Sequence, residues 1–136
     1  ELLSKTGEIE VKSQTLDDYI IENSIEQVDL LKLDLQGSEL PALSGAAKAL
    51  ADGKIKCILC EIMFQPHYES QPSASEILHE LMDKHDYTLF NLYQHHYHHG
   101  YLCQTDALLF HSSIYKTAIK KACLGFHPHS IVSVDV

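Results

Sequence analysis

Apolar and polar positions repeat with two different periods along this chain, and the change of period predicts the order of its elements. Residues 28–33 and 55–62 are nearly continuous apolar runs, as expected for strands that are covered on both faces. Residues 38–50 and 73–84 instead repeat apolar positions every three or four residues, as amphipathic helices do. The remaining predicted elements are a strand at 8–13, a helix capped by Thr15, strands at 87–93 and 105–110, and a terminal helix at 113–123.

The predicted order is strand, helix, strand, helix, strand, helix, strand, strand. This alternation indicates an α/β fold with a mostly parallel sheet and crossover helices. The last two strands have no helix between them, so we predict that the sheet ends in an antiparallel hairpin, with the His-rich residues 94–104 as its exposed connection. We expect a single domain over residues 1–136, with its core in 1–111 and a terminal helix and tail in 112–136.

Composition narrows the kinds of binding partner and the cellular compartment that we expect for this protein. With 10 Lys and Arg against 19 Asp and Glu, the formal net charge is −9, which disfavours nucleic acid and anionic membrane surfaces as partners. No apolar run approaches the roughly 20 residues of a transmembrane helix. Cys57 and Cys60 lie in one predicted strand at a spacing that points them to opposite faces, so they cannot hold one metal ion. Without a disulfide framework, we expect a reducing, cytoplasmic location.

Acidic side chains end the two most apolar predicted strands. Asp34 follows the first and Glu61 the second. Because the carboxyl ends of parallel strands share one edge, we expect the two carboxylates side by side where open α/β sheets bind ligands. His67 follows on the loop above that edge, and a histidine titrates close to neutral pH, as a base should. Structural alternatives exist: Asp34 as a turn cap, Glu61 in an ion pair and His67 as a solvated loop residue.

The residues around these carboxylates resemble the FkbM-type S-adenosylmethionine-dependent methyltransferases. The main similar segment is Asp29-Leu30-Leu31-Lys32-Leu33-Asp34-Leu35-Gln36-Gly37-Ser38-Glu39. Shorter ones are Thr15-Leu16-Asp17-Asp18, Leu43-Ser44-Gly45-Ala46, Leu59-Cys60-Glu61-Ile62, Gln65-Pro66, Tyr68-Glu69 and Thr105-Asp106-Ala107-Leu108-Leu109-Phe110. The resemblance covers roughly residues 11–110. In this family the motif usually reads Asp-x-Glu-Gly-x-Glu, so Gln36 stands in place of a glutamate.

The resemblance implies the carboxyl half of a Rossmann-like class I methyltransferase fold, whose last strand lies antiparallel beside the fifth. It implies O-methyl transfer from S-adenosylmethionine to a sugar or polyketide-like hydroxyl. The candidate catalytic residues are then Asp34, Glu61 and His67. The candidate cofactor-binding residues are Asp34 and Gln36. The candidate acceptor-binding residues are Glu39, Gln65 and Tyr68, and no metal ion is expected.

The sequence has no strand leading into a Gly-rich turn, although that element normally carries most cofactor contacts. We therefore expect the carboxyl-terminal half of a longer methyltransferase, inactive on its own. Two other interpretations stay open. One is a catalytically degenerate methyltransferase-like module that binds or scaffolds a glycan or protein. The other is an unrelated α/β domain that binds metal through His96 and His98, within the His-rich residues 95–99.

Overall fold

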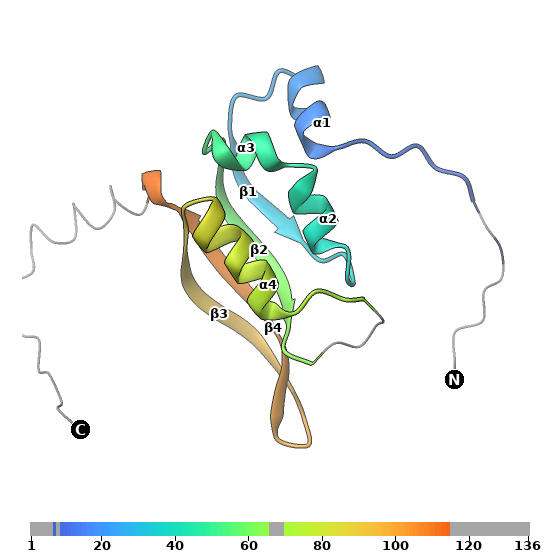
Figure 1. Ribbon diagram of the computed structural model, residues 1–136, viewed down its shortest axis with the longest axis vertical. Helices are drawn as coiled ribbons and strands as arrows, with labels where there is room; N and C mark the ends of the chain where they lie inside the picture. Colours follow the sequence, from blue (N-terminus) through green and yellow to red (C-terminus); the bar gives the residue numbers. More distant parts are fainter. Residues whose placement is uncertain (1–6, 8, 66–69, 115–136) are drawn as a thin grey trace, which may run out of the picture.

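The computed structural model describes residues 7, 9–65 and 70–114. In these residues the helices lie against one face of a four-stranded sheet (Figure 1). The elements in chain order are α1 (Leu16–Glu22), β1 (Val28–Leu33), α2 (Glu39–Ser44), α3 (Ala47–Ala51), β2 (Ile55–Met63), α4 (Ala74–Leu78), the π-helical segment η1 (His79–Lys84), β3 (Tyr87–His98) and β4 (Tyr101–His111). The predicted α/β class is therefore confirmed.

The sheet has the strand order β1-β2-β4-β3. β1 and β2 pair parallel, whereas β4 pairs antiparallel with both β2 and β3. β1, β2 and β3 consequently run in the same direction, but β4 separates β2 from β3. The prediction of a mostly parallel sheet is wrong for this reason, because only one of the three strand pairs in the described residues is parallel.

The final hairpin is longer than predicted. The sequence prediction placed an exposed connection at 94–104, but β3 continues to His98 and β4 begins at Tyr101. Only His99 and Gly100 form the turn, and both have positive φ, 48° and 83°. A two-residue turn of this kind matches the twist of the flanking strands. Tyrosines and other β-favouring side chains in this segment suit a strand. The sequence prediction instead treated the His-rich segment as an exposed connection.

The helix predicted at 38–50 is divided into α2 and α3 around Gly45. The break is held from a distance by Asp17, whose carboxylate accepts hydrogen bonds from the backbone N–H groups of Lys48 and Ala49, each at 2.9 Å. The predicted cap of α1 is present, since the Thr15 hydroxyl accepts from the Asp18 amide at 3.1 Å. Local periodicity contains no information about a cap supplied from α1.

Two further predictions concern the ends of the chain. Residues 9–13 form no strand, because no other described strand lies beside them to share backbone hydrogen bonds. The terminal helix predicted at 113–123 falls almost entirely outside the described residues. Among the helices of the described residues, none combines the length and the apolarity that a bilayer crossing requires.

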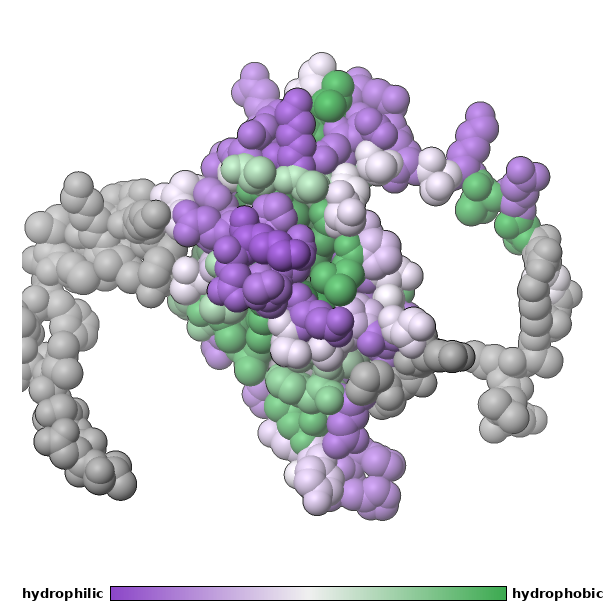
Figure 2. Space-filling model, in the orientation of Figure 1, coloured by the Kyte–Doolittle hydropathy of each residue, from purple (hydrophilic) through white to green (hydrophobic). Residues whose placement is uncertain are grey.

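The core lies between the helices and the adjacent face of the sheet. Alternate strand residues that point to the helices are almost fully buried, among them Leu33, Ile58, Cys60, Ile62, Ala107 and Leu109. The helices contribute Leu43, Leu50, Ile77 and Leu81 to the same cluster. Outward-facing side chains of the helical layer are mainly hydrophilic (Figure 2). The strands are thus fixed from one side, and their other face carries the polar residues described next.

Candidate active site at the ends of β1 and β2

The parallel pairing of β1 with β2 brings Asp34 and Glu61 to the same rim of the sheet. Leu33 is in register with Cys60, so the residue after each of them lies beside the other. The Gln36 side chain joins the two carboxylates. Its Nε2 donates to Asp34 Oδ1 at 3.2 Å and to Glu61 Oε2 at 3.0 Å. The two acidic side chains lie side by side, as expected from the sequence, and Gln36 joins them in one hydrogen-bonded cluster.

Asp34 is the exposed member of this pair. Its side chain is 43% exposed, and Lys32 Nζ lies 2.9 Å from its Oδ2. Hydrogen bonds from Lys32 and Gln36 hold the pKa of the Asp34 carboxyl below its usual value. This carboxylate consequently stays ionised at neutral pH and faces solvent at the end of β1.

Glu61 is the buried member, with only 9% of the residue exposed. Burial, followed by the nearby charges of Asp34 and Asp106, raises the pKa of its carboxyl above the usual value. Asp106 lies directly opposite Glu61 on β4. On that same strand, Gln104 Nε2 donates a short hydrogen bond to Glu61 Oε1. The environments of Glu61 and Asp34 thus shift their pKa values in opposite directions.

Glu39 shapes the loop that carries Gln36. Its carboxylate is 2% exposed and accepts hydrogen bonds from the backbone N–H groups of Leu35 at 2.9 Å and Gly37 at 3.0 Å. Gly37 has a φ of 107°, a conformation that suits glycine. The carboxylate thus points into this loop. These hydrogen bonds give the Glu39 carboxylate a structural role in holding the loop, and its acceptor-binding role stays a prediction.

The other predicted acceptor residues belong to the loop after β2. The backbone N–H of Gln65 donates to the Cys103 carbonyl at 3.3 Å, which ties the start of this loop to β4. Its side-chain Oε1 lies 3.4 Å from Cys103 Sγ. His67 and Tyr68 lie outside the described residues. Their roles, like that of Gln65, remain predictions.

Two polar residues of β4 belong to the cluster and were not predicted as site residues. Gln104 and Asp106 sit on the same face as Glu61, with His96 and Tyr93 as their partners on β3. A signal was present in the sequence, because polar residues alternate with small or apolar ones from 103 to 107. The pattern identifies a face, but only the strand order shows that this face adjoins Glu61.

The His-rich segment follows the outer half of the hairpin. His95 Nδ1 lies 2.8 Å from the Thr105 hydroxyl, and the rings of His98 and His99 meet edge to face with centroids 4.2 Å apart. Among the described residues, no three or more His, Cys, Asp or Glu side chains are arranged to hold a metal ion.

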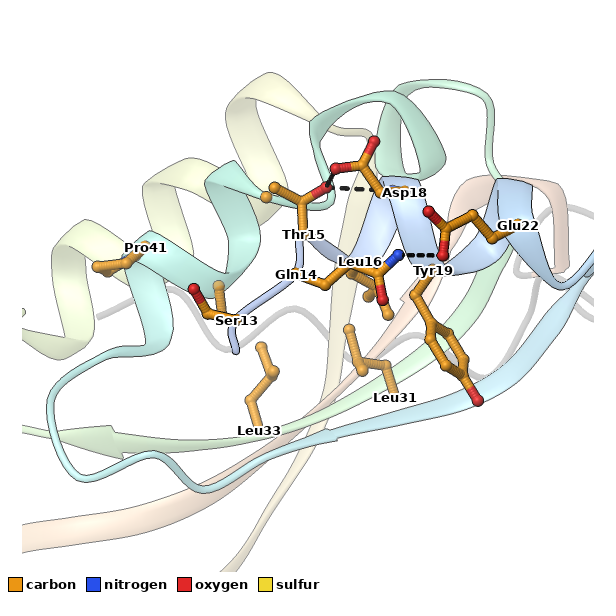
Figure 3. A pocket seen from close by; sticks show the side chains of 12 residues that line it. Ser13, Gln14, Thr15, Leu16, Asp18, Tyr19, Glu22, Leu31, Leu33 and Pro41 are labelled. Carbon is orange, nitrogen blue, oxygen red and sulfur yellow. Dashed lines mark hydrogen bonds between the residues drawn. The ribbon is translucent and has the colours of Figure 1, made fainter. Parts of the chain in front are cut away.

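A separate groove of about 780 Å³ lies between α1, α2 and β1 (Figure 3). Leu31 and Leu33 point into it from the strand, and Asp18 and Glu22 lie on its α1 side. Neither Asp34 nor Glu61 lines this groove. It follows the edge of β1 that pairs with no strand in the described part of the chain.

Comparison with known proteins identifies the family. The model of the methyltransferase FkbM domain matches residues 2–89, which include both carboxylates and the loop between β1 and α2. The 2-O-methyltransferase NoeI of Sinorhizobium fredii (strain NBRC 101917 / NGR234) is 35% identical over 72 residues, which are 53% of this chain and 29% of that protein. No solved structure matches significantly. Because the family model spans more than half of its residues, this chain belongs to the FkbM methyltransferase domain family.

Proposed function

We propose that this chain forms part of an enzyme that transfers a methyl group from S-adenosylmethionine to a hydroxyl of a sugar or polyketide-like acceptor. The observation that supports this most strongly is the pair of adjacent carboxylates, with opposite pKa shifts, inside an FkbM methyltransferase domain. Pairs of titratable groups whose environments shift their pKa values in opposite directions are typical of acid–base sites. The name of the Sinorhizobium fredii relative, a 2-O-methyltransferase, favours oxygen as the atom that is methylated.

The residues at the rim fit the chemistry of this cofactor. S-Adenosylmethionine, when bound, supplies an electrophilic methyl group on a positively charged sulfur. Asp34 offers an ionised, solvent-facing carboxylate that suits a cationic group, and Gln36 lies within hydrogen-bond distance of it. We assign these two residues to the cofactor side of the site.

Glu61 is suited to accept a proton from the acceptor hydroxyl. A hydroxyl becomes a better nucleophile when a positioned base takes its proton in the transition state. The raised pKa of Glu61 makes it a stronger base than an ordinary carboxylate. The proton that the acceptor oxygen loses on methylation therefore goes to a Glu61 oxygen. Asp34 cannot take this role as well, because its lowered pKa makes it the weaker base.

The remaining predicted residues are assigned to the acceptor pocket. His67 is a second candidate base, and Gln65 and Tyr68 would contact the acceptor from the loop after β2. The net charge of −9 favours an uncharged or cationic acceptor over a nucleic acid. We propose a cytoplasmic location, consistent with the free Cys57, Cys60 and Cys103.

The test is a methyl-transfer assay with radiolabelled S-adenosylmethionine and a panel of hydroxylated sugars and polyketides, using the full-length protein. Glu61→Gln should lower kcat by about 100-fold or more, because the proton acceptor is lost, while the Kd for S-adenosylmethionine stays near wild type. Asp34→Asn should weaken S-adenosylmethionine binding in isothermal titration. Exposed Glu10→Gln provides the control. The proposal fails if folded protein binds no S-adenosylmethionine, and binding without transfer to any acceptor would favour a degenerate binding module.

A further inference from the structure

Each oxygen of the Glu61 carboxylate is bonded to a glutamine from a different segment. Gln36 reaches Oε2 from the loop after β1 at 3.0 Å, and Gln104 reaches Oε1 from β4. These two glutamines are separated widely in sequence but meet at one side chain, because β2 lies between β1 and β4. The buried carboxylate is thus held from both sides.

The chemistry of these side chains determines which group donates and which accepts each hydrogen bond. A carboxylate only accepts hydrogen bonds, so each glutamine must present its Nε2 group. Gln36 uses the same amide nitrogen for Asp34, at 3.2 Å, and so restrains both carboxylates. An amide donor stabilises the ionised form of Glu61 without bringing a positive charge to it. A lysine or arginine at either position would instead hold the proton off so strongly that Glu61 would be a poor base.

The charges around Glu61 make such a restraint necessary. The charged groups that act on it are Lys32 from β1, Asp34 directly after that strand, Glu39 from α2 and Asp106 from β4. Three of these four are acidic, so the ionised carboxylate is repelled from most sides. Lys32 is engaged with Asp34 at 2.9 Å. The neutral amides are the hydrogen-bond donors to the Glu61 side chain that the described residues provide.

The Gln36 backbone supports the same conclusion. Its φ is 52°, in the left-handed region that residues other than glycine, asparagine and aspartate seldom adopt. The Glu39 carboxylate holds this loop through the amides on either side, Leu35 and Gly37. Unfavourable backbone conformations persist where surrounding contacts enforce them, and they gather at functional sites. Here the enforced conformation aims the amide at two carboxylates.

We propose that Gln36 and Gln104 are positioning residues that form an amide clamp on Glu61, fixing its orientation and keeping it ionised yet basic. The clamp deepens the proposed function, since only that function gives Glu61 a proton to accept. Its test does not need an acceptor.

The experiment is a carbon-13 NMR pH titration of the Glu61 carboxyl carbon in the full chain, assigned with Glu61→Gln. Gln36→Met and Gln104→Met keep the side-chain length but remove the donor. Each should raise the pKa of Glu61 by about one unit, because the ionised form loses a hydrogen bond. Gln27→Met is the matched control, since Gln27 donates to Asp29 at 2.6 Å on the exposed surface. It should leave the Glu61 titration unchanged.

The clamp is overturned if both methionine variants fold and titrate as wild type does, or if the control shifts Glu61 equally. Should Gln104→Met fail to fold, Gln104→Glu supplies the second measurement, and its added carboxylate should raise the pKa of Glu61 still further. In the methyl-transfer assay of Gln104→Met, the acid limb of the kcat profile should move with the NMR titration while KM changes little. An NMR shift without a matching kinetic shift would retain the clamp and reject Glu61 as the proton acceptor.

Discussion

The two faces of the sheet are built from alternate residues of the same strands, yet they differ in burial and in where the charged side chains lie. On the helix-covered face, Ile58 and Ala107 are completely buried in an apolar cluster. On the opposite face, Lys32 and Asp34 are solvent-exposed, and Glu61 is held by amides. Successive strand residues point to opposite sides of the sheet. Neighbouring residues of one strand can therefore differ in role, one packing in the core and the next belonging to the candidate site. Substitutions on the covered face should therefore act on folding, and those on the open face on titration and catalysis.

The largest expected effect comes from the covered face. Ile58→Ala removes a fully buried side chain from the centre of the sheet and should lower the free energy of unfolding by about 2–5 kcal/mol. Urea denaturation followed by circular dichroism measures this. Leu30→Ala is the matched control, because Leu30 is 55% exposed on β1 and should cost less than about 1 kcal/mol. Equal losses of unfolding free energy in the two variants would show that the two faces contribute equally to stability.

A smaller effect on the free energy of unfolding is expected from the loop between β1 and α2. Glu39→Gln replaces one accepting oxygen with a donor that meets a backbone N–H group, and it should cost about 1–3 kcal/mol. Amide hydrogen exchange should accelerate most at Leu35 and Gly37. If exchange instead rises evenly across β1 and β2, Glu39 stabilises the sheet as a whole rather than the loop.

The smallest effect is a difference in pH dependence within the open face. Asp34 has a lowered pKa in the folded state, so its contribution to stability is present above the unfolded pKa and is lost as pH falls through the folded pKa. Glu61 has a raised pKa, so its ionisation destabilises the fold as pH rises from the usual glutamate value through the folded one. Asp34→Asn and Glu61→Gln should consequently change the slope of stability against pH in opposite senses, by less than about 1 kcal/mol overall.

Thermal unfolding from pH 3 to 7 measures both slopes. Changes of the same sign in the two variants would show that the shared Gln36 contact, rather than the individual environments, controls the titration of this pair.

Local sequence pattern accounts for much of this structure. The apolar runs predicted β1 and β2 nearly to the residue. The helix predicted from residue 73 begins in a capping box, in which the Ser73 hydroxyl accepts from the Glu76 amide. Adjacency of Asp34 and Glu61 followed from strand direction alone. These features depend on short-range periodicity or on one parallel pair.

Features that depend on distant partners could not be found this way. The Asp17 cap on α3 and the Gln104 contact to Glu61 join segments more than 30 residues apart. Glu39 was predicted as an acceptor-binding residue in the first turn of a helix, and only the path of the loop shows that its carboxylate is buried against backbone amides. The insertion of β4 between β2 and β3 changes the pairing of the sheet without changing any local pattern.

The outer edge of β1 has a practical consequence. Its backbone groups meet no partner strand in the described residues, and a groove floored by leucines lies beside them. The other outer strand, β3, is interrupted by register shifts that blunt its edge, whereas β1 pairs with β2 without interruption. A strand edge without a pairing partner can accept another chain. We expect concentrated solutions of this chain to self-associate through β1. Leu30→Lys adds a charge to that strand and should reduce the association in light scattering.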